Sequence, residues 1–92
     1  MFYTQRVLVV DDDPLVLRLV SDKLDLAGFE VFTASSGQQA LELIDHRGLP
    51  HLAIVDINMP GMDGFEFCRT VQAYSDLPII FLTAVDEEET II

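Results

Sequence analysis

The stretch Ala53-Ile54-Val55-Asp56-Ile57-Asn58-Met59-Pro60-Gly61-Met62-Asp63-Gly64 decides the fold of this chain. It opens with a short apolar run that contains β-branched residues, which is typical of a buried strand. The run ends at Asp56 and passes into a loop that carries proline and glycines. Asp63 and Glu66 then stand where the first turn of a helix favours carboxylates. The stretch therefore predicts a strand, a loop and a helix in direct succession.

The same alternation continues on both sides of this stretch. Short apolar runs predict strands at residues 7–10, 30–34, 52–55 and 79–82. The third of these runs ends at Asp56, and the fourth ends at Thr83. Strands that alternate with helices favour an α/β fold, with a parallel sheet in the middle and helices on both faces. Continuous apolar strands fit that arrangement, because such strands are covered on both sides.

The stretches between the strands predict amphipathic helices. The first begins at Pro14, which suits a helix's first turn, and Gly28 ends it. The second has Ser36 as its N-cap, with Gln39 reaching back in a capping box, and ends near Gly48.

A third helix begins after Asp63 and carries Phe65, Cys68 and Val71 on one face. Cys68 is the single cysteine, so we expect a small buried side chain and no internal disulfide. A fourth helix is expected to start within the acidic run 86–89.

Composition limits what the chain does. Its 92 residues allow one domain, and half of them are hydrophobic, which excludes a disordered acidic tail. With 16 acidic and 5 basic residues the formal charge is −11, so nucleic-acid binding by this segment is not expected. No run approaches the roughly 20 apolar residues of a membrane span. The N-terminus does not have the build of a signal peptide, and we expect a cytoplasmic protein.

The predicted strands deliver polar groups to one edge of the sheet. Ligands of open α/β sheets bind beyond the carboxyl ends of the strands, and here these ends carry residues 11–13, Asp56 and Thr83. Clustered carboxylates repel one another, and Mg²⁺ relieves that repulsion because it prefers hard oxygen ligands. Asp12 and Asp56 would each give one oxygen to such an ion. A carboxylate beside Mg²⁺ and a hydroxyl is also a plausible nucleophile towards phosphorus.

Each of these residues also has a simpler interpretation. Asp12 or Asp13 can cap the helix that begins at Pro14, and Thr83 can be an ordinary strand residue. The joint pattern in this strand–helix order favours a functional edge. His46 and His51 flank a loop without cysteines at metal-ligand spacing, and we expect them to be surface residues.

The sequence resembles the receiver domain of bacterial two-component response regulators. The resemblance is carried by residues 7–14, by residues 53–64 and by residues 77–84, of which the middle segment is the most specific. It implies a flavodoxin-like receiver fold and a cytoplasmic signalling module that is not a turnover enzyme. It also implies that Asp56 takes a phosphoryl group from the phosphohistidine of a histidine kinase or phosphotransfer protein.

The resemblance implies further roles for residues at the strand ends. Asp11 and Asp12 would form the acidic pair that binds Mg²⁺, with Asp12 as a direct ligand and Asp11 acting mainly through water. Asp56 and the backbone carbonyl of Asn58 would complete the protein's ligands to the metal. Thr83 would be the switch hydroxyl. The backbone N–H of Ala84 would bind the phosphoryl group.

The side chains that tune dephosphorylation in this family would be Asn58 and Val85. The first of these can orient a water molecule, and the second cannot.

The resemblance also implies a departure from the family. Receivers have strand order 2-1-3-4-5, so we expect residues 1–92 to form a receiver domain that is incomplete at its C-terminus, without the fifth strand, the fifth helix and the family's lysine. Lys23 is the single lysine and does not match that position, so slow phosphoryl transfer is expected. Residues 77–82 would become an exposed sheet edge, which predicts a homodimer through edge pairing. An output domain would lie beyond Ile92.

Two other functions compete with this interpretation. A phosphatase of the haloacid-dehalogenase type would use Asp11 and Asp13 as an Asp-x-Asp pair, but it leaves Asp56 and the loop after it without a role. A degenerate receiver would only bind a partner protein. The intact acidic pair and Asp56 argue against that for a complete receiver, and for residues 1–92 this alternative stays open. The sequence does not name the kinase or the input signal.

Overall fold

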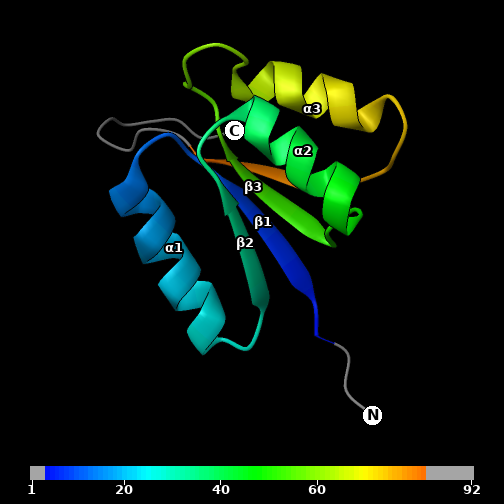
Figure 1. Ribbon diagram of the computed structural model, residues 1–92. Coiled ribbons are helices and arrows are strands. Elements are labelled where there is room, and N and C mark those ends of the chain that lie inside the picture. Colours follow the sequence, from blue (N-terminus) through cyan, green and yellow to red (C-terminus); the bar gives the residue numbers. More distant parts are fainter. Residues whose placement is uncertain (1–3, 83–92) are drawn as a thin grey trace.

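The computed structural model describes residues 4–82, which form a twisted sheet with helices on both faces (Figure 1). The elements in chain order are β1 (Arg6–Val10), α1 (Pro14–Leu26), β2 (Glu30–Ala34), α2 (Gly37–Arg47), β3 (Leu52–Asp56), α3 (Gly64–Gln72) and β4 (Ile79–Leu82). The helix expected from residue 86 lies outside the described residues. The predicted alternation of strands and helices is confirmed for the part of the chain that the structure describes.

The sheet has four parallel strands in the order β2-β1-β3-β4. This is the order expected for the first four strands of the receiver fold. In its register Val10 lies opposite Val55, and Asp56 lies opposite Leu82. The carboxyl ends of β1, β3 and β4 therefore meet at one edge of the sheet.

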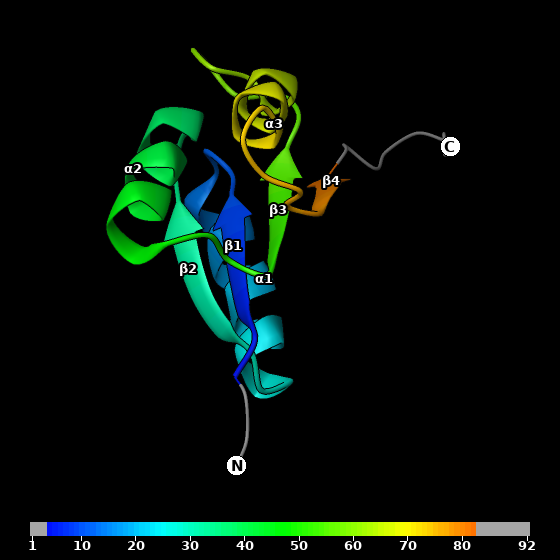
Figure 2. The same cartoon turned by 90° about the vertical axis from the view of Figure 1, so that its right-hand side faces the viewer.

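The two faces of the sheet are covered unequally. α2 and α3 cover one face, and α1 lies on the other (Figures 1 and 2). Between the sheet and α2 and α3 lies one continuous hydrophobic core, formed by Leu8, Val10, Ala34, Ala40, Ile44, Ala53, Val55, Met59, Phe67, Val71 and Leu77. Burial of this apolar surface is the main force that holds the sheet and the two helices together.

The face towards α1 is more open. Val7 and Val9 of β1 are buried there, but no residue of α1 itself is buried. Ile80 of β4 remains 53% exposed, and β4 is an edge strand among the described residues.

The helix starts follow the predicted capping residues, with one difference. Ser36 accepts the Gln39 N–H at 3.0 Å, as expected for the N-cap of α2. The Gln39 side chain, however, accepts from the backbone N–H of Ser35 rather than from that of Ser36. The reciprocal capping box stands at α3, where Asp63 and Glu66 bind each other's backbone N–H groups at 2.9 and 3.1 Å.

Of the three residues expected on one face of α3 only Val71 is fully buried, and the expectation of a buried Cys68 is not met. Phe65 is 46% exposed and Cys68 is half-buried, whereas Phe67 and Val71 are fully buried. The helix is rotated so that Phe67 enters the core between α3 and the sheet. Phe65 instead packs its ring against Phe81 of β4, with centroids 5.0 Å apart.

Among residues 4–82 no helix is long and apolar enough to cross a membrane.

We predict that Phe67→Ala destabilises the domain far more than Phe65→Ala does. The first change empties a fully buried site and should cost about 3–5 kcal/mol of unfolding free energy. The second removes the same atoms from a half-exposed site of the same helix and should cost roughly 0.5–1.5 kcal/mol. Urea unfolding followed by circular dichroism measures both, and equal losses would contradict the placement of the core.

Candidate functional site

Three carboxylates meet at the carboxyl edge of the sheet. Asp11 follows the last residue of β1, and Asp56 is the last residue of β3, the neighbouring strand. One carboxylate oxygen from each of Asp11, Asp12 and Asp56 lies within 4.8 Å of the others. The structure therefore brings together three of the side chains that the sequence placed at this edge.

The three carboxylates differ in their exposure to water. Asp11 is only 5% exposed, Asp56 is half-buried and Asp12 is exposed. Asp11 is tied into the fold, because its N–H donates to the Ala34 carbonyl at 3.1 Å and its Oδ1 accepts the Asp13 N–H at 2.9 Å. The cluster therefore runs from an anchored carboxylate to one that is open to solvent.

Asp13 takes no part in the cluster. Its side chain accepts the Leu15 N–H at 2.9 Å and caps α1, so the capping alternative holds for Asp13 and not for Asp12. Asp11 thus lies in the cluster and Asp13 at the helix cap. The structure does not place the two carboxylates together, as a site of the haloacid-dehalogenase type would require.

Burial raises the pKa of the Asp11 carboxyl above its ordinary value of 3.8. The hydrogen bond from the Asp13 N–H opposes this shift by favouring the charged form. The negative charges of Asp56, Asp12 and Asp13 raise the pKa further. The cluster therefore holds more negative charge than its surroundings neutralise, which favours binding of a cation.

The loop after Asp56 is closed at its base. The Gly64 N–H donates to the Ile57 carbonyl at 3.0 Å, and a Cβ at Gly64 would collide with the carbonyl oxygen of Asp56. Asn58 turns back towards the cluster, because its N–H donates to Asp56 Oδ1 at 3.2 Å. A glycine at position 64 is thus required for the close approach of α3 to the end of β3.

An open cleft of about 510 Å³ lies in front of the cluster. Residues 11–13, Asp56 and Asn58 supply its polar wall. Sequence reasoning missed its apolar wall, since Val16, Val20 and Leu82 read only as helix and strand positions. Two of these side chains come from α1, so the helix that starts beside the acidic cluster also shapes the approach to it.

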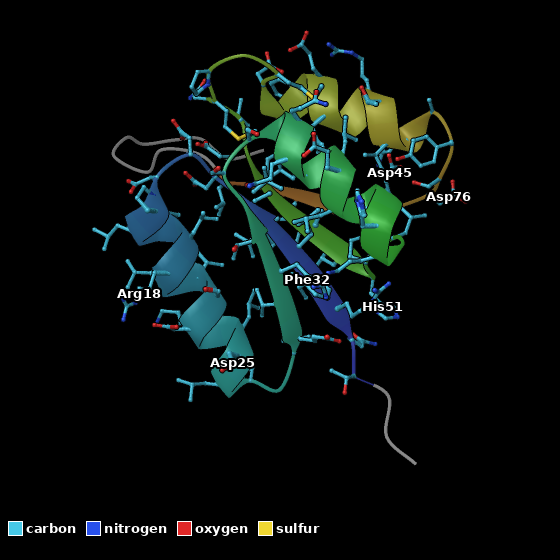
Figure 3. All side chains as sticks on the ribbon, in the orientation of Figure 1. Arg18, Asp25, Phe32, Asp45, His51 and Asp76 are labelled. Atoms are coloured by element: carbon cyan, nitrogen blue, oxygen red, sulfur yellow. The ribbon has the colours of Figure 1, made fainter. Side chains whose placement is uncertain are left out.

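The two histidines lie away from this site. His51 is exposed at the opposite end of the strands, where its Nδ1 pairs with the backbone N–H of Arg6 at 2.8 Å (Figure 3). His46 is exposed on α2, and its Nδ1 lies 2.9 Å from the Glu42 carbonyl. Both are surface residues, as predicted from the sequence.

The donor set of the cluster fits Mg²⁺. Carboxylate oxygens are hard ligands, and Mg²⁺ binds such oxygens at about 2.1 Å. The three carboxylate oxygens lie within 4.8 Å of one another, so side-chain adjustment would bring them to a single ion. Asp11, Asp12 and Asp56 are the residues that would hold the ion.

Comparison with known proteins agrees with these features. Residues 7–92 match the family described as "Response regulator receiver domain". The chain belongs to the response regulator receiver family. The receiver fold expected from the sequence motifs is thereby confirmed, and the chain is a two-component signalling module at the level of its family.

The receiver is similar to proteins of known name in several organisms. It is 41% identical over 83 residues to the "Probable transcriptional regulator ycf27" of Pyropia yezoensis, covering 90% of this chain and 34% of that protein. It is 43% identical over 79 residues to the "Heme response regulator HssR" of Staphylococcus aureus, strain Newman, covering 86% of this chain and 35% of that protein. The receiver thus spans about a third of the length of these curated relatives.

A solved structure of the family shows the same architecture. The response regulator TrrA of Thermotoga maritima, crystallised in complex with Mg²⁺ and BeF, superimposes with a TM-score of 0.82 at 38% identity. The match covers 90% of this chain and 72% of that one. A relative of this similarity thus holds Mg²⁺, and the receiver described here carries an Asp cluster suited to that ion.

Three residues assigned roles from the family resemblance, Thr83, Ala84 and Val85, lie outside the described residues. Lys23 is exposed on α1.

We predict that Asp11 makes the metal-free receiver less stable as the pH rises. Because its folded-state pKa is raised, the folded state holds this proton more tightly than the unfolded state does. The resulting stabilisation is present below the ordinary value of 3.8 and is lost as the pH rises through the raised pKa. Wild type should therefore lose unfolding free energy relative to Asp11→Asn across that window.

Urea unfolding at a series of pH values, with chelator present, measures this difference. Asp25→Asn removes one charge from an exposed site on α1 and serves as the control. Parallel stability curves for wild type and Asp11→Asn would contradict the prediction.

Proposed function

We propose that this receiver is a phosphorylation-dependent signalling module that accepts a phosphoryl group on Asp56 in a Mg²⁺-dependent reaction. The observation that carries the proposal is the cluster of Asp11, Asp12 and Asp56 at the edge of an open cleft. The donor is the phosphohistidine of a sensor histidine kinase or of a phosphotransfer protein. The receiver then acts as a switch that phosphorylates and dephosphorylates itself, without turnover of a substrate.

The nucleophile is held in a defined way. Because Asp56 Oδ1 accepts the Asn58 N–H, we assign the attack on phosphorus to Oδ2. A bond forms between Oδ2 and phosphorus while the P–N bond of the phosphohistidine breaks, and its electron pair returns to the imidazole nitrogen. The product is an aspartyl phosphate, a known type of covalent intermediate.

The metal site uses the same residues. Asp12 would hold Mg²⁺ directly, Asp11 would act mainly through water, and Asp56 with the backbone carbonyl of Asn58 would supply the remaining protein oxygens. When bound, the ion neutralises the charge that builds up on the transferred group. Asp11, anchored by two backbone contacts, keeps the acidic pair in place for this task.

The switch itself is assigned to residues that follow β4. Leu82, the last described residue of that strand, pairs with Asp56, and Ile57 N–H donates to its carbonyl at 3.4 Å. This neighbourhood supports a role for the next residue, Thr83, as the hydroxyl that binds the phosphoryl oxygens, with the N–H of Ala84 as a second donor. Asn58 would orient the water for dephosphorylation, and Val85 would not.

The wider context completes the proposal. The receiver works in the cytoplasm and passes its signal to an output region of a longer protein. The length of the curated relatives supports this assignment. With a charge of −11, the segment itself binds no nucleic acid. A degenerate receiver that only binds a partner is the alternative, and the experiment below separates the two.

We predict that acetyl phosphate with Mg²⁺ adds one phosphoryl group to the wild-type receiver and none to Asp56→Asn. Acetyl phosphate replaces the phosphohistidine as donor, and Asn lacks the nucleophilic oxygen. Intact-mass spectrometry measures the gain. Asp45→Asn, at an exposed site on α2, is the matched control and should gain the group as wild type does.

Chelation of Mg²⁺ should abolish the gain in wild type. A wild-type receiver that gains no phosphoryl group with Mg²⁺ present would contradict the proposal and favour the degenerate receiver that only binds a partner. A gain in Asp56→Asn would move the nucleophile to another residue.

A second copy of the chain is the other proposed partner. β4 is an edge strand among the described residues, and Ile80 is 53% exposed on it. An apolar edge strand with free backbone groups favours pairing with the same strand of a second molecule. The charge of −11 on each copy opposes association, so the dimer should be favoured by salt.

We predict that Ile80→Lys converts such a dimer to monomer, because it places a charge on the pairing edge. Leu26→Lys, which changes an 88% exposed leucine at the end of α1, is the control and should leave the dimer intact. Light scattering at high micromolar concentration measures the mass. A wild-type monomer at that concentration would contradict the edge-pairing proposal without affecting the phosphorylation proposal.

A further inference from the structure

Met62, in the loop between β3 and α3 (residues 57–63), lies close to the start of α2. A Cβ placed on Gly37 would lie 2.8 Å from Sδ of Met62, 3.0 Å from its Cγ and 3.2 Å from its Cβ. The Met62 side chain therefore lies directly against the Cα of Gly37. Gly37 is buried at the first position of α2, right after the N-cap Ser36. The contact joins the loop to a helix that is itself fixed in the core.

The loop is fixed at its other end by Gly64. Its N–H closes the loop onto the Ile57 carbonyl at 3.0 Å, and its Cα packs on the carbonyl of Asp56. Within the loop, Met59 is buried in the core, and Gly61 adopts a φ of +77°. The loop thus has a closed base and two methionines that pack inwards, and Met62 is the one that lies against Gly37.

This loop carries the residue that touches the nucleophile. The Asn58 N–H donates to Asp56 Oδ1 at 3.2 Å, so the position of the loop decides how the Asp56 carboxylate is held. A displacement of the loop would move the Asn58 backbone away from the acidic cluster. Mutation of a residue that orients a metal ligand typically weakens metal binding by roughly 10–100-fold.

We propose that Met62 is a positioning residue, whose contact with Gly37 holds the loop so that the backbone of Asn58 stays beside the Asp56 carboxylate. The consequence for Mg²⁺ binding rests on the function proposed above, whereas the consequence for the loop does not. A Cβ at position 37 would force the Met62 side chain to shift, because it would lie 2.8 Å from Sδ of Met62. The contact makes the start of α2 part of the support of the phosphorylation site, although no residue of α2 reaches the acidic cluster.

The test compares four single variants and one double variant with wild type at a temperature where all are folded. Met62→Ala removes the contact, Met62→Leu keeps apolar bulk at the same place, and Gly37→Ala pushes the methionine away. Gly28→Ala is the matched control. Gly28 has a φ of +99°, a Cβ there would meet no atom within 4 Å, and the residue lies outside the loop. It should lower stability through backbone strain alone.

The first readout needs no metal. Hydrogen exchange of the Asn58 and Gly64 amides, followed by NMR with chelator present, reports how firmly the loop is held. Met62→Ala and Gly37→Ala should raise these rates roughly tenfold relative to the amides of β1. Met62→Leu should restore most of the protection, and Gly28→Ala should leave the loop amides unchanged relative to β1.

The second readout is the Mg²⁺ dissociation constant from titration calorimetry. Met62→Ala and Gly37→Ala should weaken binding roughly tenfold, whereas Gly28→Ala should not change it. In the double variant Gly37→Ala/Met62→Ala the second change should add little, because the methionine that it displaces is already gone.

Loop exchange rates that match those of Gly28→Ala would overturn the positioning role. So would fully additive losses in the double variant. A wild-type receiver that binds no Mg²⁺ would instead refute the proposed metal site, and the exchange data would still decide the role of Met62.

Discussion

The parallel pairing of β1 with β3 is the constraint on which the rest of this receiver depends. The pairing sets Val10 opposite Val55, and the next residue along the chain after each of them is an aspartate. Apolar burial along the strands drives the pairing, while the repulsion between the carboxylates at its end opposes it. Burial and the neighbouring carboxylates destabilise the charged form of Asp11 at this edge, as its raised pKa indicates. A bound cation would relieve the repulsion between the carboxylates. The strand pairing that stabilises the fold therefore also brings the residues of the site together.

The three consecutive aspartates after β1 show how backbone geometry divides roles among identical side chains. Asp11 continues the strand direction and is buried, with its N–H bonded to Ala34. Asp12 points to solvent within the cluster, and Asp13 turns to cap α1. The cap holds the start of α1 beside the cleft, where Val16 and Val20 line one wall. Two carboxylates thus serve the site and the third serves the helix that borders it.

Much of this arrangement could be predicted from the sequence, and the exceptions have physical reasons. Strand ends could be placed because apolar runs stop abruptly at Asp11 and Asp56, and parallel order then brings those ends together. The buried face of α3 could not be read correctly, since Phe65, Cys68 and Val71 are spaced as regularly as the residues that are actually buried. Only the packing of the helix on the sheet decides between the two faces. The contact of Met62 with Gly37 joins residues far apart in sequence, and no local pattern indicates it.

The site lies between the well-packed side of the sheet, which α2 and α3 cover, and the more open side, which α1 covers. On one side, the core under α2 and α3 fixes β3, the loop after it and the close approach of Gly64 to Asp56. On the other side, α1 buries none of its residues fully, and the cleft opens between it and the strand ends. A nucleophile needs both conditions, because its carboxylate must be oriented while a bulky donor approaches it. The loop of residues 57–63 packs on the core side through Met59 and Met62, so the backbone that contacts the Asp56 carboxylate is held from that side while the cleft lies on the other.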